Sequence, residues 1–233
     1  GSLNPGVPGH SNPYYASMVD SLDWSIGKVV TYLEQTDDPR NPGYKLIDNT
    51  YVIIDSDNGG WKGSQNEPIT DNHPLRGGKM NSYEGGIRIP FIIRGPKVPA
   101  GSTCETPINL IDLFPTFMEM AAVPPDSSLK LDGCNILPLI EGTSEQVIQA
   151  DGKERDTLFW FYPLESHMDR TKTGYRVYPL ESHMAVVMQQ AGWKLVNNLG
   201  VGYAGKWADV ENKQLVELFQ IKKGEQQSAD LGE

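Results

Sequence analysis

The stretch "NTYVIIDSDNGG", from Asn49 to Gly60, decides the fold of this chain. Its apolar, β-branched run predicts a buried strand, and the acid, amide and glycine pair that follow predict a sharp loop at the strand's carboxyl end. In open α/β sheets, ligands gather beyond the carboxyl ends of the strands. The loop after this strand is therefore the first candidate for a functional site.

The segments around this strand alternate between helix and strand patterns. Apolar residues at helical spacing predict a helix over residues 14–35, with Asn12 as its N-cap and Pro13 in its first position. A second strand is predicted within "IRIPFIIRGP", and a second helix, capped by Asp112, within "IDLFPTFMEMAAV". This order predicts the α/β fold class, with helices against a mostly parallel sheet.

The character of the chain changes near Asp151. Short strand-like runs separated by turns predict a small antiparallel sheet: "TLFWFYPL", "HMAVVMQQ", "WKLVNN" and "QLVELFQI". We therefore expect an α/β part over residues 1–150 and a small antiparallel-sheet subdomain over residues 151–233. The aromatic side chains of the first run are expected to pack in a core rather than to stack on a sugar.

Composition narrows the range of partners. The chain has 30 acidic and 20 basic residues, a net charge of −10, which argues against nucleic-acid binding but permits a local anion site. No apolar run reaches the roughly 18 residues that predict a membrane span. The two cysteines, Cys104 and Cys134, allow one disulfide at most. A repeated "YPLESHM", at residues 162–168 and 178–184, favours a local duplication over a metal site built by its two histidines.

Two neighbouring loops carry residues with a chemical interpretation. Asp57 and Asn58 offer a carboxylate and an amide oxygen, the hard ligands that Ca²⁺ or Mg²⁺ prefers. Farther along, Arg76 and Lys79 flank a glycine pair, where backbone N–H groups can approach an anion and the lysine adds a positive charge. Taken separately, each loop is more typical of an ordinary turn or surface loop than of a site.

Taken in order, these segments resemble the sulfatase family of the alkaline-phosphatase superfamily. Family members carry a strand ending in "SDNG", then "PLRGGK" and "YEGG", and this chain has "SDNGG", "PLRGGK" and "YEGGIR" in that order. The segments "IDLFPTFMEMA", "LDGCNILPLIEG" and "GWKLV" resemble later parts of the family pattern. The resemblance implies an alkaline-phosphatase-like sandwich and the hydrolysis of sulfate esters.

The resemblance also implies roles for the matching residues. Asp57 and Asn58 match two metal ligands of the family, with Ca²⁺ the usual ion and Mg²⁺ an alternative. Lys79 matches the catalytic lysine that contacts the sulfate ester and stabilises charge on its leaving oxygen. These three residues are the expected metal-binding and catalytic set.

Three further residues lie in or beside the matched motifs. Arg76 and Glu84 fall on motif positions, where we expect them to shape the loop rather than carry out chemistry. Arg76 is also a substrate-binding candidate because of its charge. His73 is a second one, because it sits next to the motif where it could line the pocket.

The chain departs from the family at the nucleophile. The family uses a formylglycine made from Cys or Ser in a "C-x-P-S-R" motif, which is absent here, and neither Cys104 nor Cys134 fits it. The chain therefore resembles the C-terminal half of a sulfatase, inactive alone. Its expected partners are the N-terminal half of the same protein and a sulfate ester, with a sulfated carbohydrate as one possibility.

Two alternatives stay open on these residues. A phosphodiesterase or phosphonate hydrolase of the same superfamily shares the metal-loop arrangement. A non-catalytic module that binds sulfated glycans through the antiparallel subdomain is the other. Because family members are often exported, the resemblance implies a periplasmic, extracellular or lysosomal location.

Overall fold

The structure is a computed structural model that describes residues 12–62, 69–80, 82–124, 128–162, 185–190, 192–198 and 216–220. The chain divides into two compact units, each assembled from separated stretches of sequence. We call Gly1–Leu33, Asp55–Phe91 and Phe159–Glu233 the loop unit, and Glu34–Ile54 with Ile92–Leu158 the core unit. The expected domain boundary at residue 150 stays a prediction.

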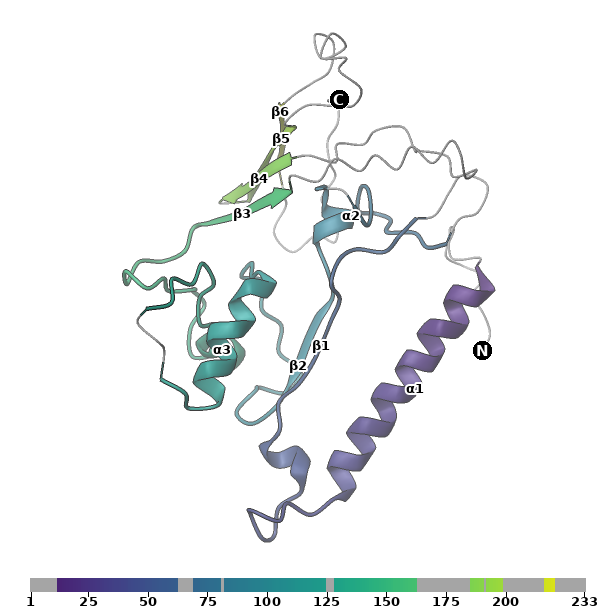
Figure 1. Ribbon diagram of the computed structural model, residues 1–233, viewed down its shortest axis with the longest axis vertical. Helices are drawn as coiled ribbons and strands as arrows, with labels where there is room; N and C mark the ends of the chain where they lie inside the picture. Colours follow the sequence, from purple (N-terminus) through teal and green to yellow (C-terminus); the bar gives the residue numbers. More distant parts are fainter. Residues whose placement is uncertain are drawn as a thin grey trace. The chain divides into compact units, whose positions relative to one another are not determined.

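Helices α1 and α3 and the six strands occur where their sequence patterns predict them, whereas the short helices α2 and α4 were not predicted (Figure 1). The helices are α1 (Pro13–Gln35), α2 (Glu84–Ile87), α3 (Leu113–Met120) and α4 (Leu137–Ile140), with short 3₁₀ turns η1 (Leu46–Asn49) and η2 (Leu110–Asp112). The strands are β1 (Val52–Asp55), β2 (Phe91–Arg94), β3 (Thr157–Tyr162), β4 (Ala185–Gln190), β5 (Trp193–Asn198) and β6 (Val216–Gln220).

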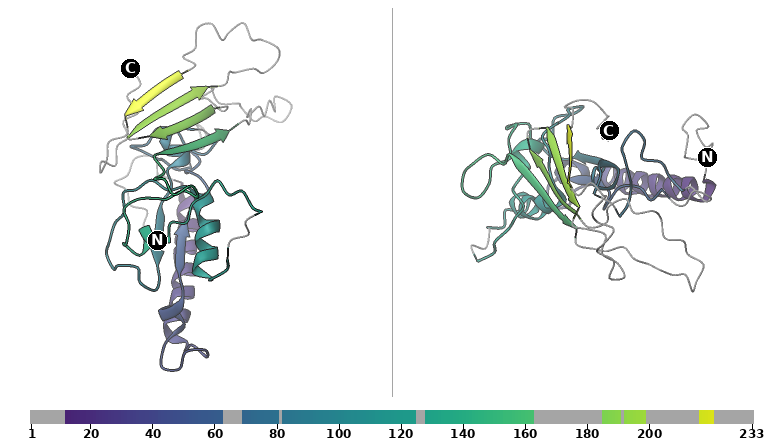
Figure 2. Two further views of the ribbon diagram at one scale, coloured as in Figure 1. Left: turned by 90° about the vertical axis from the view of Figure 1, so that its left-hand side faces the viewer. Right: turned by 90° about the horizontal axis from the view of Figure 1, so that it is seen from above.

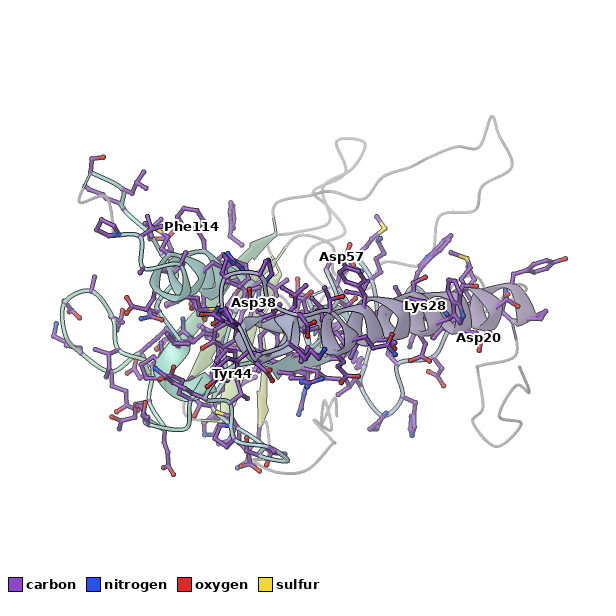
Figure 3. All side chains as sticks on the ribbon, turned by 90° about the horizontal axis from the view of Figure 1, so that it is seen from below. Asp20, Lys28, Asp38, Tyr44, Asp57 and Phe114 are labelled. Atoms are coloured by element: carbon purple, nitrogen blue, oxygen red, sulfur yellow. The ribbon has the colours of Figure 1, made fainter. Side chains whose placement is uncertain are left out.

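Helix α1 begins as its sequence predicts. The Asn12 Oδ1 atom accepts hydrogen bonds from the backbone N–H groups of Tyr14 and Tyr15, both at 3.0 Å, and Pro13 occupies the first helical position. The helix has no buried residue, and Figure 3 shows side chains standing out along it, among them those of Asp20 and Lys28. None of the described helices combines the length and apolar composition that crossing a membrane requires.

The core unit holds the larger hydrophobic core. Strands β1 and β2 pair in a two-stranded sheet, and Tyr51, Ile93 and Met120 pack against a buried cluster that comes from the segment after α3. The buried cluster consists of Cys134, Ile136, Leu139, Ile140 and Val147. The strand expected to be buried is only half-buried in β1, because this sheet has just two strands among the described residues. A larger, mostly parallel sheet stays a prediction.

Asp112 lies at the start of α3, but its side chain does not cap that helix. The carboxylate is completely buried and binds the Arg155 guanidinium at two points, Nη1 to Oδ1 at 2.6 Å and Nη2 to Oδ2 at 2.9 Å. It also accepts the backbone N–H groups of Cys134 and Asn109, both at 2.8 Å. The expectation of a simple cap was wrong, because four donors draw this carboxylate into a buried network instead.

Strands β3 to β6 form a four-stranded sheet in sequence order (Figure 2). Strand β5 runs antiparallel to both β4 and β6, which confirms the antiparallel sheet predicted for the C-terminal region. The alternation along β5 places Lys194 and Val196 on one face, where both are fully buried, while Trp193 is exposed. The two histidines of the repeated "YPLESHM" lie outside the described residues.

The aromatic residues of β3 divide between the two faces of the strand. Trp160 packs against the small buried cluster of Tyr83 and Val196, as expected for core packing. Phe159 and Phe161 are 62% and 69% exposed, so for these two the expectation of core packing was wrong. The alternation of a strand puts side chains i and i+2 on the same side, and in β3 that side lacks a covering layer among the described residues.

Candidate active-site loops

Three glycine pairs of the loop unit meet at one place. The pairs belong to "SDNGG", "PLRGGK" and "YEGG", the three motifs that the sequence singles out. We call residues 59–60, 76–79 and 84–86 the glycine junction. Its three backbone hydrogen bonds run from Gly59 N to Gly86 O at 2.9 Å, from Lys79 N to Gly60 O at 3.0 Å, and from Gly85 N to Arg76 O at 2.7 Å.

Side chains would not fit in the glycine junction. A Cβ atom on Gly59 would overlap the carbonyl oxygen of Gly85, and one on Gly85 would lie 2.5 Å from the carbonyl oxygens of Arg76 and Gly77. Gly77 also has a φ of +77°, which residues with a side chain rarely adopt. The glycines are therefore required by the close approach of three backbones, rather than by loop flexibility.

Asn72 holds two of the three loops together. Its Oδ1 atom accepts the N–H of Gly60 at 3.1 Å, while its Nδ2 atom donates to the carbonyl oxygens of Gly60 at 2.8 Å and Gly77 at 3.1 Å. Sequence reasoning missed this residue, because an asparagine in a polar loop is typical of any turn. Only the close approach of the loops reveals its role.

Asp57 and Asn58 follow β1 directly and lead into the glycine junction. Asn58 donates its Nδ2 to the Gly59 carbonyl at 3.0 Å, and Ser56 Oγ donates to the backbone oxygen of Asn58 at 2.8 Å. Within the described part of the chain, the Asp57 carboxylate and the Asn58 Oδ1 atom have no hydrogen-bond or ion-pair partner. These two hard oxygen donors fit Ca²⁺ or Mg²⁺ chemically.

Two donors do not complete a metal site. The described residues contain no group of three or more His, Cys, Asp or Glu side chains that could hold a metal ion. Ca²⁺ takes about six to eight oxygen ligands in proteins. Asp57 and Asn58 can therefore supply only part of a ligand shell.

The cations of the second loop differ in their surroundings. Lys79 is anchored by its backbone to Gly60, while its exposed side chain makes no ion pair with any described residue. The Arg76 guanidinium lies 3.8 Å from the centre of the Tyr83 ring, a cation–π contact that holds the loop against α2. The structure thus brings the loop of Lys79 to the loop that begins at Asp57.

His73 remains apart from this arrangement. Its side chain is exposed, and its backbone N–H donates to Asp71 Oδ1 at 3.1 Å in the turn before the junction. None of the three backbone hydrogen bonds of the glycine junction involves this residue. A role for His73 in substrate binding stays a prediction.

Glu84 is the only acid of the junction, and its side chain is buried. It accepts a hydrogen bond at 2.7 Å from the Nζ atom of Lys194, which is itself fully buried in β5. Sequence reasoning treated "GWKLV" as a closing strand and missed this lysine. A signal was available, because in "WKLV" the lysine shares its strand face with a valine.

Comparisons with known proteins cover the same part of the chain. The family model described as Sulfatase matches residues 8–123, a span that contains the whole glycine junction. This chain belongs to the sulfatase family. Its motifs therefore lie in the part of the chain that carries the family match, with the C-terminal sheet beyond that part.

Individual sulfatases are similar over part of this chain. A sulfatase of Formosa agariphila is 34% identical over 160 residues, which is 67% of this chain and 27% of that protein. Human steryl-sulfatase is 32% identical over 141 residues, or 57% of this chain and 22% of that protein. The chain spans about a quarter of the length of these curated relatives.

Solved structures extend the likeness to most of the fold. A protein solved with its substrate D-glucosamine-2-N,6-O-disulfate matches 87% of this chain with a TM-score of 0.54 and 26% identity, over 32% of its own length. A second structure, from work on glycosaminoglycan metabolism by Bacteroides thetaiotaomicron, matches 94% of this chain and 43% of its own, with a TM-score of 0.56 and 20% identity. The second shows the α/β sulfatase fold alone.

Proposed function

We propose that this chain is the C-terminal portion of a sulfatase, that it supplies two metal ligands and a sulfate-contacting lysine, and that it is inactive alone. The observation that carries the proposal is the 3.0 Å hydrogen bond from Lys79 N to Gly60 O. It joins the two loops on which the metal-ligating and cationic side chains stand. The family assignment favours a sulfuric ester hydrolase over a phosphodiesterase or phosphonate hydrolase.

The chemistry follows from where negative charge lies in a sulfate ester. The ester resists hydrolysis because its charged oxygens repel nucleophiles. Asp57 and Asn58 would hold Ca²⁺ or Mg²⁺, which when bound withdraws charge from the sulfate oxygens. The Lys79 ammonium would stabilise the leaving oxygen, where negative charge grows as the ester bond breaks.

Other residues and groups would complete the site. Arg76 and His73 would contact the ester from the edge of the loop, although Arg76 also shapes the loop through its contact with Tyr83. The nucleophile, a formylglycine, and the other metal ligands would come from the remainder of the protein. A substrate site assembled this way explains why the described residues provide only two metal donors.

The exposed apolar side chains of helix α1 are evidence that another part of the same protein packs against this helix. Seven of its large apolar side chains are exposed: Tyr14, Met18, Val19, Leu22, Trp24, Val29 and Tyr32. An amphipathic helix gains stability by burying its apolar face, which α1 does not do here. The chain spans only about a quarter of its curated relatives, so an N-terminal half of the same protein is the proposed cover.

A sulfated carbohydrate is the proposed substrate class. The protein with 26% identity and a TM-score of 0.54 was solved with D-glucosamine-2-N,6-O-disulfate as its substrate. That sugar carries sulfate on nitrogen and on oxygen, and a metal with a lysine suits either group. An exported location, in the periplasm, lysosome or outside the cell, is proposed only because members of the family are often exported.

The proposal is tested by comparing the 233-residue chain with the full-length protein. The full-length protein should hydrolyse an aryl sulfate, whereas the chain alone should show no turnover and no tight Ca²⁺ binding by calorimetry. In the full-length protein, Asp57→Ala should weaken Ca²⁺ binding by roughly tenfold or more. The variant Asp132→Ala, at an exposed position in another loop, is the matched control. Turnover by the chain alone, or normal Ca²⁺ affinity in Asp57→Ala, would refute the proposal.

One observation favours a second function for the antiparallel sheet. Phe159 and Phe161 stand exposed on the same face of β3, in the arrangement that stacking on sugar rings requires. A non-catalytic module for sulfated glycans would use these side chains and not Lys79. Binding of a sulfated polysaccharide that survives Lys79→Ala and is lost in Phe159→Ala/Phe161→Ala would support the module.

A further inference from the structure

The buried ion pair between α2 and the C-terminal sheet has no part in the chemistry proposed above. The Lys194 Nζ atom lies 2.7 Å from Glu84 Oε1, and the two side chains are 0% and 5% exposed. Lysine is almost never fully buried unless its charge is paired. Because the partners are 110 positions apart, the pair joins β5 to the "YEGG" segment across the loop unit.

Stability alone does not account for a lysine at this position. Lys194 shares its strand face with Val196, which is buried in an apolar cluster with Tyr83. Replacing a buried ion pair by apolar residues of similar volume is often neutral or stabilising, because removing charges from water is costly. The pair instead defines a position, because it holds the Glu84 carboxylate at one point of the sheet.

Glu84 is followed directly by Gly85 and Gly86, whose backbones contact the other two loops of the glycine junction. Gly85 donates its N–H to the Arg76 carbonyl at 2.7 Å, and the Gly86 carbonyl accepts the N–H of Gly59 at 2.9 Å. A Cβ on Gly85 would already be 2.5 Å from the Arg76 oxygen, so these backbones touch. A displacement of Glu84 therefore moves both of the other loops.

We propose that Lys194 is a positioning residue for the candidate site. Through Glu84 it holds the glycine junction, and with it the backbone of Lys79, in a fixed place. The effect on catalysis rests on the proposed function, whereas the link between β5 and the junction does not. The small C-terminal sheet is then part of the framework of the site.

The direct test is amide hydrogen exchange in the 233-residue chain. The variant Lys194→Met/Glu84→Gln removes both charges and keeps the lengths of the two side chains. The amide protons of Gly59, Lys79 and Gly85, which donate the three junction hydrogen bonds, should exchange about tenfold faster or more. The amide protons of the β4–β5 ladder should keep their rates.

The matched control removes the buried pair of the core unit with Arg155→Met/Asp112→Asn. It should leave the exchange of the junction amides unchanged. Unchanged junction exchange in the Lys194→Met/Glu84→Gln variant would overturn the proposal. An equal loss of protection in the β5 ladder would overturn it too, because that pattern describes a pair that only stabilises the sheet.

A milder variant keeps the proposal testable if the double variant does not fold. Glu84→Asp retains both charges and shortens the link by one methylene group, so the junction amides should again exchange faster, and unchanged rates would overturn the proposal. In the full-length protein, Glu84→Asp should lower kcat while KM stays within about twofold. Faster exchange with an unchanged kcat would support the link and count against the proposed function.

Discussion

Among the described residues, each unit contains one ion pair with both partners buried, and the surroundings of the two pairs differ. In the core unit, Asp112 meets Arg155 through two bonds and takes two further backbone N–H groups, beside a well-filled apolar core. In the loop unit, Glu84 meets Lys194 beside a small cluster, and the residues that follow are glycines in backbone contact.

The contrast teaches how the same interaction takes on different roles. Where side chains fill the space, a buried ion pair is one contact among many, and its loss is a loss of stability. Where glycines leave only backbone, few other contacts define position, and the same kind of pair governs geometry. The predictions that follow test this distinction, from the largest expected effect to the smallest.

Removing Asp112 should have the largest effect on folding. Asp112→Ala leaves the Arg155 guanidinium buried without its carboxylate, which should lower the free energy of unfolding by about 3–5 kcal/mol. Urea denaturation measures the loss, with the exposed Asp132→Ala as control, expected within about 0.5 kcal/mol of wild type. A loss below 1 kcal/mol, on the order of a surface change, would contradict a structural role for this pair.

Removing Lys79 should have a comparable effect on activity and none on folding. In the full-length protein, Lys79→Ala should lower kcat roughly 100- to 1,000-fold, because charge on the leaving oxygen loses its fixed cation. The melting temperature should not change, since this side chain makes no ion pair with any described residue. Lys153→Ala, which removes an exposed lysine paired with Asp151, is the matched control. An unchanged kcat in Lys79→Ala would count against the assigned role.

Filling the junction should have an intermediate effect. Gly85→Ala forces the touching backbones apart and should cost about 1–3 kcal/mol of stability in the loop unit. The control is Gly27→Ala in α1, where a Cβ meets nothing within 4 Å and should stabilise the helix by up to about 1 kcal/mol. Equal melting curves for the two variants would show that the junction is not closely packed.

The smallest expected effect concerns the two free cysteines. Cys104 is exposed, whereas Cys134 is buried in the core unit, and burial raises the pKa of its thiol. A thiol with a raised pKa holds less thiolate at neutral pH, so Cys134 should react with a thiol reagent roughly tenfold or more slowly than Cys104. Mass spectrometry of partly labelled chain separates the two sites. Equal rates would indicate that the core opens readily.

Much of the local structure could be predicted from the sequence. Asn12 and Pro13 define the start of α1, and the four C-terminal runs are strands, because caps and apolar periodicity act over a few residues. The three glycine motifs were recognisable for the same reason. The contact among the three motifs could not be predicted, because no pattern within one motif shows that Gly59 lies against Gly85.

The long-range contacts were beyond the reach of local patterns. Asp112 has the sequence position of a helix cap, yet its partner Arg155 comes from 43 residues away. Lys194 has the position of an ordinary strand residue, yet its partner lies 110 residues earlier. In both cases burial decides the role of the charge, and burial depends on the packing of distant segments.

The most direct test of the central claim is a crystal structure of the full-length protein with Ca²⁺ and sulfate bound. We expect oxygens of Asp57 and Asn58 at about 2.3–2.6 Å from the metal ion. We expect the Lys79 Nζ atom at about 2.7–3.2 Å from an oxygen of the same sulfate. A structure in which the side chains of Asp57 and Lys79 point into separate hollows, with no shared anion, would contradict the account.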